Sequence, residues 1–136
     1  MKSNILVVDD EPVARQSLTE ILRLEGYAVN SVPNGQAAVE YVRTHPIELI
    51  IVDLRMPGMG GLEVLKRLAS ARPDIPVIMV SGRGDIRTAV KAIKAGAAEF
   101  LEKPVDPEEL VEVVKRIAGR QRGEAGARPS AVVDVW

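Results

Sequence analysis

The chain has 136 residues, enough for one domain with a hydrophobic core and too few for two ordinary domains. A formal net charge of -1 provides no basic surface for nucleic acid or an anionic membrane, and the absence of cysteine excludes disulfides and thiolate metal sites. With 46% hydrophobic and 27% charged residues, and no apolar stretch approaching the roughly 20 residues that span a bilayer, we expect a soluble, cytoplasmic protein.

The first half of the chain alternates apolar runs with helical patterns. Residues 5–8 predict a strand buried on both faces, because the run is continuous and rich in branched side chains. The following helix begins near Pro12, which suits an opening helical position, and ends at Gly26. Residues 27–32 are more polar and predict an edge strand. A helix over 34–44 then opens on an asparagine, a good cap.

The same alternation continues in the second half. We predict buried strands and one further edge strand over residues 49–52, 77–80 and 99–102. One helix should start after Gly61 and end before Pro73, and another should run from about Asp85 to Gly96. We expect these two helices to face the core with Leu62, Leu65, Leu68, Ala69, Ile86, Val90 and Ile93.

The last helix has the clearest start in the sequence. Asp106 is a good cap, Pro107 suits the first helical position, and Glu109 completes a capping-box arrangement. After this helix the composition changes to glycine, alanine, arginine and glutamate. We therefore expect a domain over residues 1–119 and a flexible tail or linker over residues 120–136.

Five strand–helix units in a row predict an α/β fold with a parallel sheet, right-handed crossovers and helices on both faces. Polar residues follow the buried strands: Asp9 and Asp10 after the first, Asp53 after the third, Ser81 after the fourth and Lys103 after the fifth. Because ligands bind beyond the carboxyl ends of parallel strands, we expect these side chains to form one site. Taken singly, each is more often a cap or turn residue, so it is their shared location that favours a site.

Carboxylates held close together repel one another unless a cation joins them. Mg²⁺ prefers oxygen ligands, and a set of aspartates, a hydroxyl and a lysine suits a phosphoryl group that one carboxylate can attack. The sequence therefore predicts phosphoryl chemistry on an aspartate in a magnesium site.

Over about residues 4–119 the chain resembles the receiver domains of bacterial two-component response regulators. The resemblance is carried by residues 7–11, 53–58, 80–82 and 100–104, and residues 78–110 are most similar to receivers of nitrogen-regulation-type enhancer-binding activators. It implies a flavodoxin-like, doubly wound five-stranded parallel sheet in the order 2-1-3-4-5.

The resemblance also implies roles for individual residues. Asp53 would accept a phosphoryl group from a sensor histidine kinase or a phosphotransfer protein, and Lys103 would pair with the phosphorylated side chain. Asp10, Asp53 and the backbone carbonyl of Arg55 would bind Mg²⁺ directly, with Asp9 acting largely through water.

Two further residues would form the switch of such a domain. Ser81 would move toward the phosphoryl oxygens and Phe100 would turn inward, shifting the fourth helix, fifth strand and fifth helix to control an output domain or partner. The protein would phosphorylate and dephosphorylate itself but act stoichiometrically, so it would not be a turnover enzyme. A homodimer formed on phosphorylation is a further expectation.

The arginines at positions 55 and 83 suggest a hypothesis of their own. Each lies two residues after a site residue, so their guanidinium groups could shield an acyl phosphate from water, although both could simply face solvent. Arg55 also weighs against an aspartate-based phosphohydrolase, which generally needs a second aspartate there. A degenerate receiver serving as a scaffold would not need the complete site, and a DNA-binding domain would need a basic patch.

Overall fold

The computed structural model describes residues 3–56, 58–82 and 86–121. Within these residues five parallel strands form one sheet in the order β2-β1-β3-β4-β5. The strands are β1 (Asn4–Val8), β2 (Ala28–Val32), β3 (Leu49–Asp53), β4 (Val77–Ser81) and β5 (Glu99–Glu102). The predicted α/β class and the strand order 2-1-3-4-5 are both confirmed.

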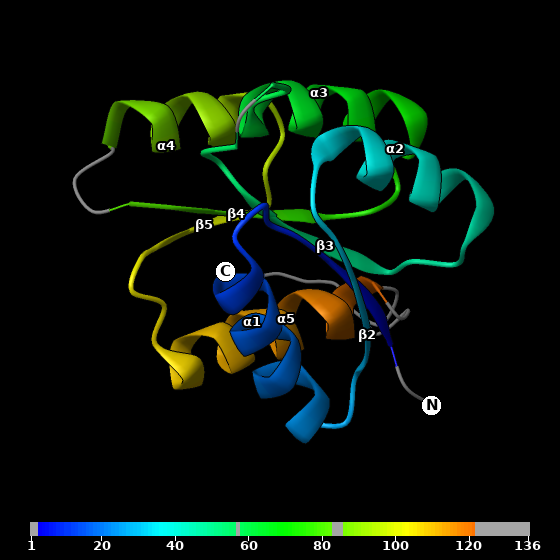
Figure 1. Cartoon of the computed structure of the whole chain (residues 1–136), viewed down its shortest axis with the longest axis vertical. Coiled ribbons are helices and arrows are strands. Elements are labelled where there is room, and N and C mark those ends of the chain that lie inside the picture. The colour runs from blue at the N-terminus through cyan, green and yellow to red at the C-terminus, as the bar shows by residue number, and fades with distance from the viewer. Residues whose placement is uncertain (1–2, 57, 83–85, 122–136) are drawn as a thin grey trace.

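Helices cover both faces of the sheet. They are α1 (Pro12–Leu24), α2 (Gly35–Thr44), α3 (Gly61–Ala71), α4 (Ile86–Lys94) and α5 (Pro107–Gln121). Figure 1 shows α2, α3 and α4 on one face and α1 and α5 on the other. No described helix combines the length and apolar character needed to cross a bilayer. Helix α5 extends two residues past the expected domain end at residue 119, and residues 122–136 lie outside the described chain, so the flexible tail stays a prediction.

The buried strands divide the core into two clusters. Every residue of β3 and β4 is buried, as the continuous apolar runs predicted, whereas the edge strands β2 and β5 are partly exposed. Alternate strand residues point to opposite faces, so Leu6, Ile50 and Met79 pack with α2–α4 while Ile5, Ile51 and Ile78 pack with α1 and α5. This two-sided burial gives the sheet a rigid frame whose carboxyl edge can hold polar groups.

The predicted inward face of α4 is wrong. Ile86, Val90 and Ile93 are 73%, 47% and 49% exposed, and Ala92 is the buried residue of this helix. The spacing correctly indicated an apolar stripe, but spacing does not say what a stripe faces. Helix α4 contacts the sheet through its small residue Ala92 and leaves its branched side chains outside.

The predicted face of α3 also needs one correction. Leu65 and Leu68 are buried as expected, but Ala69 is exposed and Val64 is buried in its place. Positions 64 and 69 lie on opposite sides of the central stripe, so a small rotation of the helix decides which one enters the core. The larger Val64 does so and packs directly against Gly35, where a Cβ atom would collide with it.

Candidate functional site

The carboxyl ends of β1 and β3 place two aspartates side by side. Val8 of β1 is in register with Val52 of β3, so the next residues in each chain segment, Asp9 and Asp53, emerge at the same edge. With Asp10, they offer three carboxylate oxygens that all lie within 4.8 Å of one another. The predicted acidic cluster is therefore assembled by the sheet.

Asp9 is held almost entirely inside the protein, at 1% exposure. Its backbone N–H donates to the Val32 carbonyl (3.2 Å), and its Oδ1 accepts from the Glu11 N–H (3.0 Å). Its Oδ2 is buried and has no hydrogen-bond partner within the described chain, the Lys103 Nζ lying 3.8 Å away. Burial raises the pKa of Asp9, and the nearby charge of Asp53 adds to this, while the Glu11 N–H and the Lys103 ammonium oppose it.

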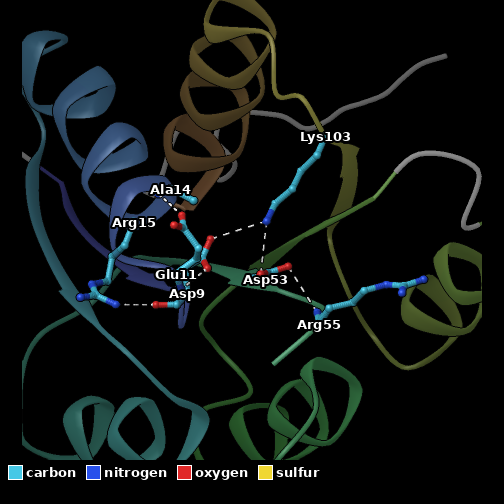
Figure 2. A network of polar contacts seen from close by, with 7 residues as sticks. All are labelled: Asp9, Glu11, Ala14, Arg15, Asp53, Arg55 and Lys103. Atoms are coloured by element: carbon cyan, nitrogen blue, oxygen red, sulfur yellow. Dashed lines mark hydrogen bonds and ion pairs between the residues drawn. The ribbon is translucent and has the colours of Figure 1, made fainter. Parts of the chain in front are cut away.

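Asp53 is the last residue of β3 and is only 6% exposed. Its Oδ1 accepts from the Arg55 N–H at 3.3 Å, and its Oδ2 lies 3.3 Å from Lys103 Nζ. Figure 2 shows the Lys103 side chain reaching down to both aspartates from the loop after β5. One ammonium group thus lies between two carboxylates that would otherwise repel each other.

The loop after β3 is shaped by a glycine. The Gly61 N–H donates to the Leu54 carbonyl (2.9 Å), and a Cβ atom at position 61 would lie 2.8 Å from that carbonyl oxygen and 2.9 Å from the carbonyl oxygen of Asp53. Only a residue without a side chain allows the start of α3 to approach the end of β3 this closely. Gly61 therefore helps to fix the segment that carries Asp53 and Arg55.

Ser81 and Lys103 lie at the same edge of the sheet, Ser81 at the end of β4 and Lys103 in the loop directly after β5. Ser81 is the fully buried last residue of β4, and its carbonyl accepts from the Lys103 N–H at 2.7 Å. The Lys103–Pro104 peptide bond is cis. The hydrogen bond from the Lys103 N–H to the Ser81 carbonyl ties the position of the lysine to the end of β4.

The donor set fits a hard divalent cation. It consists of carboxylate oxygens, and one of them, the Asp9 Oδ2, is buried with no hydrogen-bond donor among the described residues and with the Lys103 ammonium no closer than 3.8 Å. A buried anionic oxygen of this kind is costly unless a cation or a donor reaches it. Mg²⁺ favours such oxygen ligands, so the residues present suit this ion.

Arg55 contacts the Asp53 carboxylate through its backbone N–H. The Arg55 side chain is exposed and extends away from Asp53 in Figure 2, and Arg83 lies outside the described residues. Phe100 is half-buried, packs against the cluster under α2–α4, and lines a cavity of about 500 Å³ with Ile86 and Ala89.

The sequence reasoning missed Arg15. Its Nη1 donates to the backbone carbonyl of Asp9 at 2.8 Å, which places a cation next to the aspartate pair. The sequence contained a signal for it. The helix dipole favours acidic residues near a helix N-terminus, but the first turn of α1 has none, and the basic Arg15 lies near this end. A residue type that is locally unfavourable at its position in a helix often makes a tertiary contact that compensates for it.

Comparison with known proteins agrees with this arrangement. Residues 5–115 match the response regulator receiver domain family. The chain is 37% identical over 110 residues to the transcriptional regulatory protein FixJ of Rhizobium meliloti, covering 81% of this chain and 54% of that protein. It is 38% identical over 118 residues to the nitrogen assimilation regulatory protein NtrX of Azorhizobium caulinodans, covering 85% of this chain and 26% of that one.

A solved structure gives the same result. The receiver domain of NtrX from Brucella abortus superposes with a TM-score of 0.82 at 35% identity, covering 85% of this chain and 98% of that domain. The chain thus spans all but a small part of a receiver domain but only about half of FixJ and a quarter of NtrX.

Proposed function

Because the chain belongs to the response regulator receiver domain family, whose function is phosphorylation at an aspartate and which partners with histidine kinases, we propose that Asp53 is its phosphoryl acceptor. Receiver domains are in general not conventional enzymes. The observation that carries the proposal is the position of Asp53 at the end of a central strand, with Lys103 Nζ 3.3 Å from its Oδ2 and Asp9 beside it.

The proposed reaction transfers a phosphoryl group from a phosphohistidine of the kinase or of a phosphotransfer protein. A carboxylate oxygen of Asp53 attacks phosphorus, the P–N bond breaks, and its electron pair returns to the imidazole. Lys103 is close enough to place its positive charge against the phosphoryl oxygens as the P–O bond forms. In a separate hydrolysis step, water attacks phosphorus, the P–O bond to Asp53 breaks, and inorganic phosphate leaves, which restores the carboxylate; both steps are catalysed by the domain itself.

We assign a Mg²⁺ site to the same edge. Asp10, Asp53 and the backbone carbonyl of Arg55 would bind the ion, with Asp9 acting largely through water. Bound Mg²⁺ would neutralise the charge of the phosphoryl oxygens and of the carboxylates. The buried Oδ2 of Asp9 supports this assignment: it accepts no hydrogen bond in the described chain, and Lys103 Nζ lies 3.8 Å away, so a divalent cation would compensate its charge more fully.

Phosphorylation would act as a local change of charge that biases a two-state surface. Ser81 and Phe100 would carry the change to α4, β5 and α5, which would control an output domain or a partner. The exposed apolar residues Ile86, Val90 and Ile93 on α4 suit contact with a second copy of the chain in the phosphorylated state.

Three expectations from the sequence belong to this proposal. The domain itself would not contact nucleic acid, so any DNA binding would come from another domain, and it would act in the cytoplasm beside its kinase.

Arg55 and Arg83 would slow hydrolysis by shielding the acyl phosphate. For Arg55 this requires its exposed side chain to swing back toward Asp53, and unchanged dephosphorylation rates in Arg55→Ala and Arg83→Ala would refute it.

The deciding experiment is intact-protein mass spectrometry after incubation with Mg²⁺ and a small acyl-phosphate donor. We expect one added phosphoryl group on the parent chain and none on Asp53→Asn. A cognate or surrogate histidine kinase should be tried in parallel. If neither donor modifies the parent, or if Asp53→Asn is modified equally, Asp53 is not the acceptor and a scaffold role gains support.

A further inference from the structure

The orientation of Asp9 is determined by hydrogen bonds to all of its polar atoms except one. Its N–H is bound to Val32, its Oδ1 receives the Glu11 N–H, and its backbone carbonyl receives Arg15 Nη1. The remaining atom, Oδ2, lies in the group of carboxylate oxygens shared with Asp10 and Asp53. The three bonds together therefore hold Asp9 with its Oδ2, which accepts no hydrogen bond in the described chain and lies 3.8 Å from Lys103 Nζ, among the oxygens of the proposed metal position.

We infer that Arg15 is a positioning residue for Mg²⁺ binding: it holds the main chain of Asp9, and so the start of the acidic pair, in the geometry the ion requires. Figure 2 shows its guanidinium group bent back from α1 toward the Asp9 carbonyl. The bond is short at 2.8 Å and partly buried, so water competes poorly for it. This inference rests on the proposed function.

Arg15 is well anchored for such a role. It lies in the second turn of α1, and its own carbonyl accepts a hydrogen bond from Thr19 Oγ1 at 2.8 Å. Thr19 is buried, so the helix carrying the arginine is packed against the rest of the fold. The side chain therefore links a fixed helix to the strand end where Asp9 emerges.

Two physical effects of Arg15 oppose each other. Its positive charge near the carboxylates would repel a divalent cation and weaken binding. Its hydrogen bond would hold Asp9 in place and strengthen binding, as supporting contacts of metal ligands usually do. If removing the Arg15 side chain lowers the Mg²⁺ affinity, its positioning effect is the larger one; if removal raises the affinity, its charge is.

Helix α1 also supplies a matched control. Arg23 Nη2 donates to the carbonyl of Val29 at 2.7 Å, which is likewise a guanidinium–carbonyl contact between residues six apart in sequence. Its acceptor lies within β2, and Arg23 has no contact with the acidic cluster. A general loss of attachment between α1 and the sheet should affect both arginines, whereas a role in metal binding should affect only Arg15.

The test is calorimetric titration of the whole chain with Mg²⁺ alone. We expect Arg15→Ala to weaken Mg²⁺ binding, raising the dissociation constant about 10-fold. Arg23→Ala should stay within about 2-fold, and Arg15→Lys, which keeps a donor, should recover most of the loss. Thermal melts without Mg²⁺ establish that each variant folds; if Arg15→Ala does not, Arg15→Gln and Arg15→Lys provide the comparison.

Tighter or unchanged Mg²⁺ binding in Arg15→Ala, or an equal loss in Arg23→Ala, would overturn the inference. So would a parent chain with no saturable Mg²⁺ binding. If the parent binds Mg²⁺ and Arg15→Ala binds it weakly, but Asp53 accepts no phosphoryl group, the positioning role stands and the proposed function fails.

Discussion

The side-chain nitrogen of Lys103 lies 3.3 Å from a carboxylate oxygen of Asp53, a residue 50 positions away in the sequence. The same nitrogen is 3.8 Å from the Asp9 Oδ2. Lys103 is about one-third exposed while both aspartates are buried, so the ammonium reaches from solvent into the site. The ammonium lies on the side of the carboxylates that faces the loop after β5. It would therefore compete with a cation bound by the same carboxylates.

Replacing Lys103 with methionine tests this competition. An ammonium and Mg²⁺ repel each other at such distances, so Lys103→Met should bind Mg²⁺ about 3-fold more tightly. The same change should slow phosphorylation of Asp53 about 100-fold, because a positive charge close to the phosphoryl oxygens is lost. Calorimetry and timed mass spectrometry measure the two effects. Lys115→Met is the control, since Lys115 pairs with Glu25 on the surface, and weaker Mg²⁺ binding in Lys103→Met would contradict the prediction.

Asp9→Asn should stabilise the chain in the absence of divalent cations. Burial raises the folded-state pKa of Asp9 above its ordinary value of 3.8. The folded state therefore holds more protons than the unfolded state between pH 3.8 and the raised pKa, and stability falls as the pH rises through that window. Above the raised pKa the full cost is present, so Asp9→Asn should there raise the melting temperature by a few degrees, corresponding to about 1 kcal/mol.

The pH series and the metal provide the checks on this effect. The gain from Asp9→Asn should shrink as the pH is lowered toward 3.8, and saturating Mg²⁺ should reverse it because the parent keeps a charged ligand. Asp74→Asn should behave oppositely, since the hydrogen bond from Arg72 lowers the pKa of that carboxyl. A melting temperature above the raised pKa that is equal or lower in Asp9→Asn without Mg²⁺ would refute the prediction.

Gly61→Ala should destabilise the protein by about 2 kcal/mol, because its Cβ would overlap the backbone of Leu54 and force the β3–α3 loop apart. Gly119→Ala is the matched control: it lies within α5, and its Cβ would meet nothing within 4 Å. That change should be neutral or stabilising by about 0.5 kcal/mol. Denaturant unfolding compares the two variants, and equal stabilities would mean that the loop relaxes around the added methyl group.

Val90→Asp tests the exposed stripe of α4. Val90 is 47% exposed, so the stability should change little, by about 0.5 kcal/mol or less. Self-association of the phosphorylated chain, followed by light scattering, should be lost. Leu24→Asp is the control because Leu24 is 87% exposed but lies on α1. Phosphorylated Val90→Asp that associates as the parent does would exclude this face.

Phe100→Ala should separate phosphorylation from its consequence. Phe100 packs between the core and the cavity beside α4 and does not touch the carboxylates, so Asp53 should still gain a phosphoryl group. The response of the α4 surface, read as phosphorylation-dependent association, should be reduced. Failure of Asp53 to react in a folded Phe100→Ala would instead assign the phenylalanine a structural role.

Local patterns in the sequence were sufficient for most of the architecture. Continuous branched runs identified β1, β3 and β4, because only strands covered on both faces are apolar at every position. Asn34 and Asp106 marked helix starts that the structure confirms through side-chain bonds to Ala37 and Glu108. The strand order came from the family resemblance, since spacing alone does not determine it.

The acidic edge could also be predicted, because the carboxyl ends of parallel strands must meet. What only the tertiary structure decided were contacts that depend on the rotation and approach of whole elements. The spacing of Ile86, Val90 and Ile93 defines a stripe, but the docking of α4 through Ala92 turned that stripe outward. The bond from Arg15 to the Asp9 carbonyl likewise has no sequence period, because a long flexible side chain meets a main-chain atom only once helix and strand are packed together.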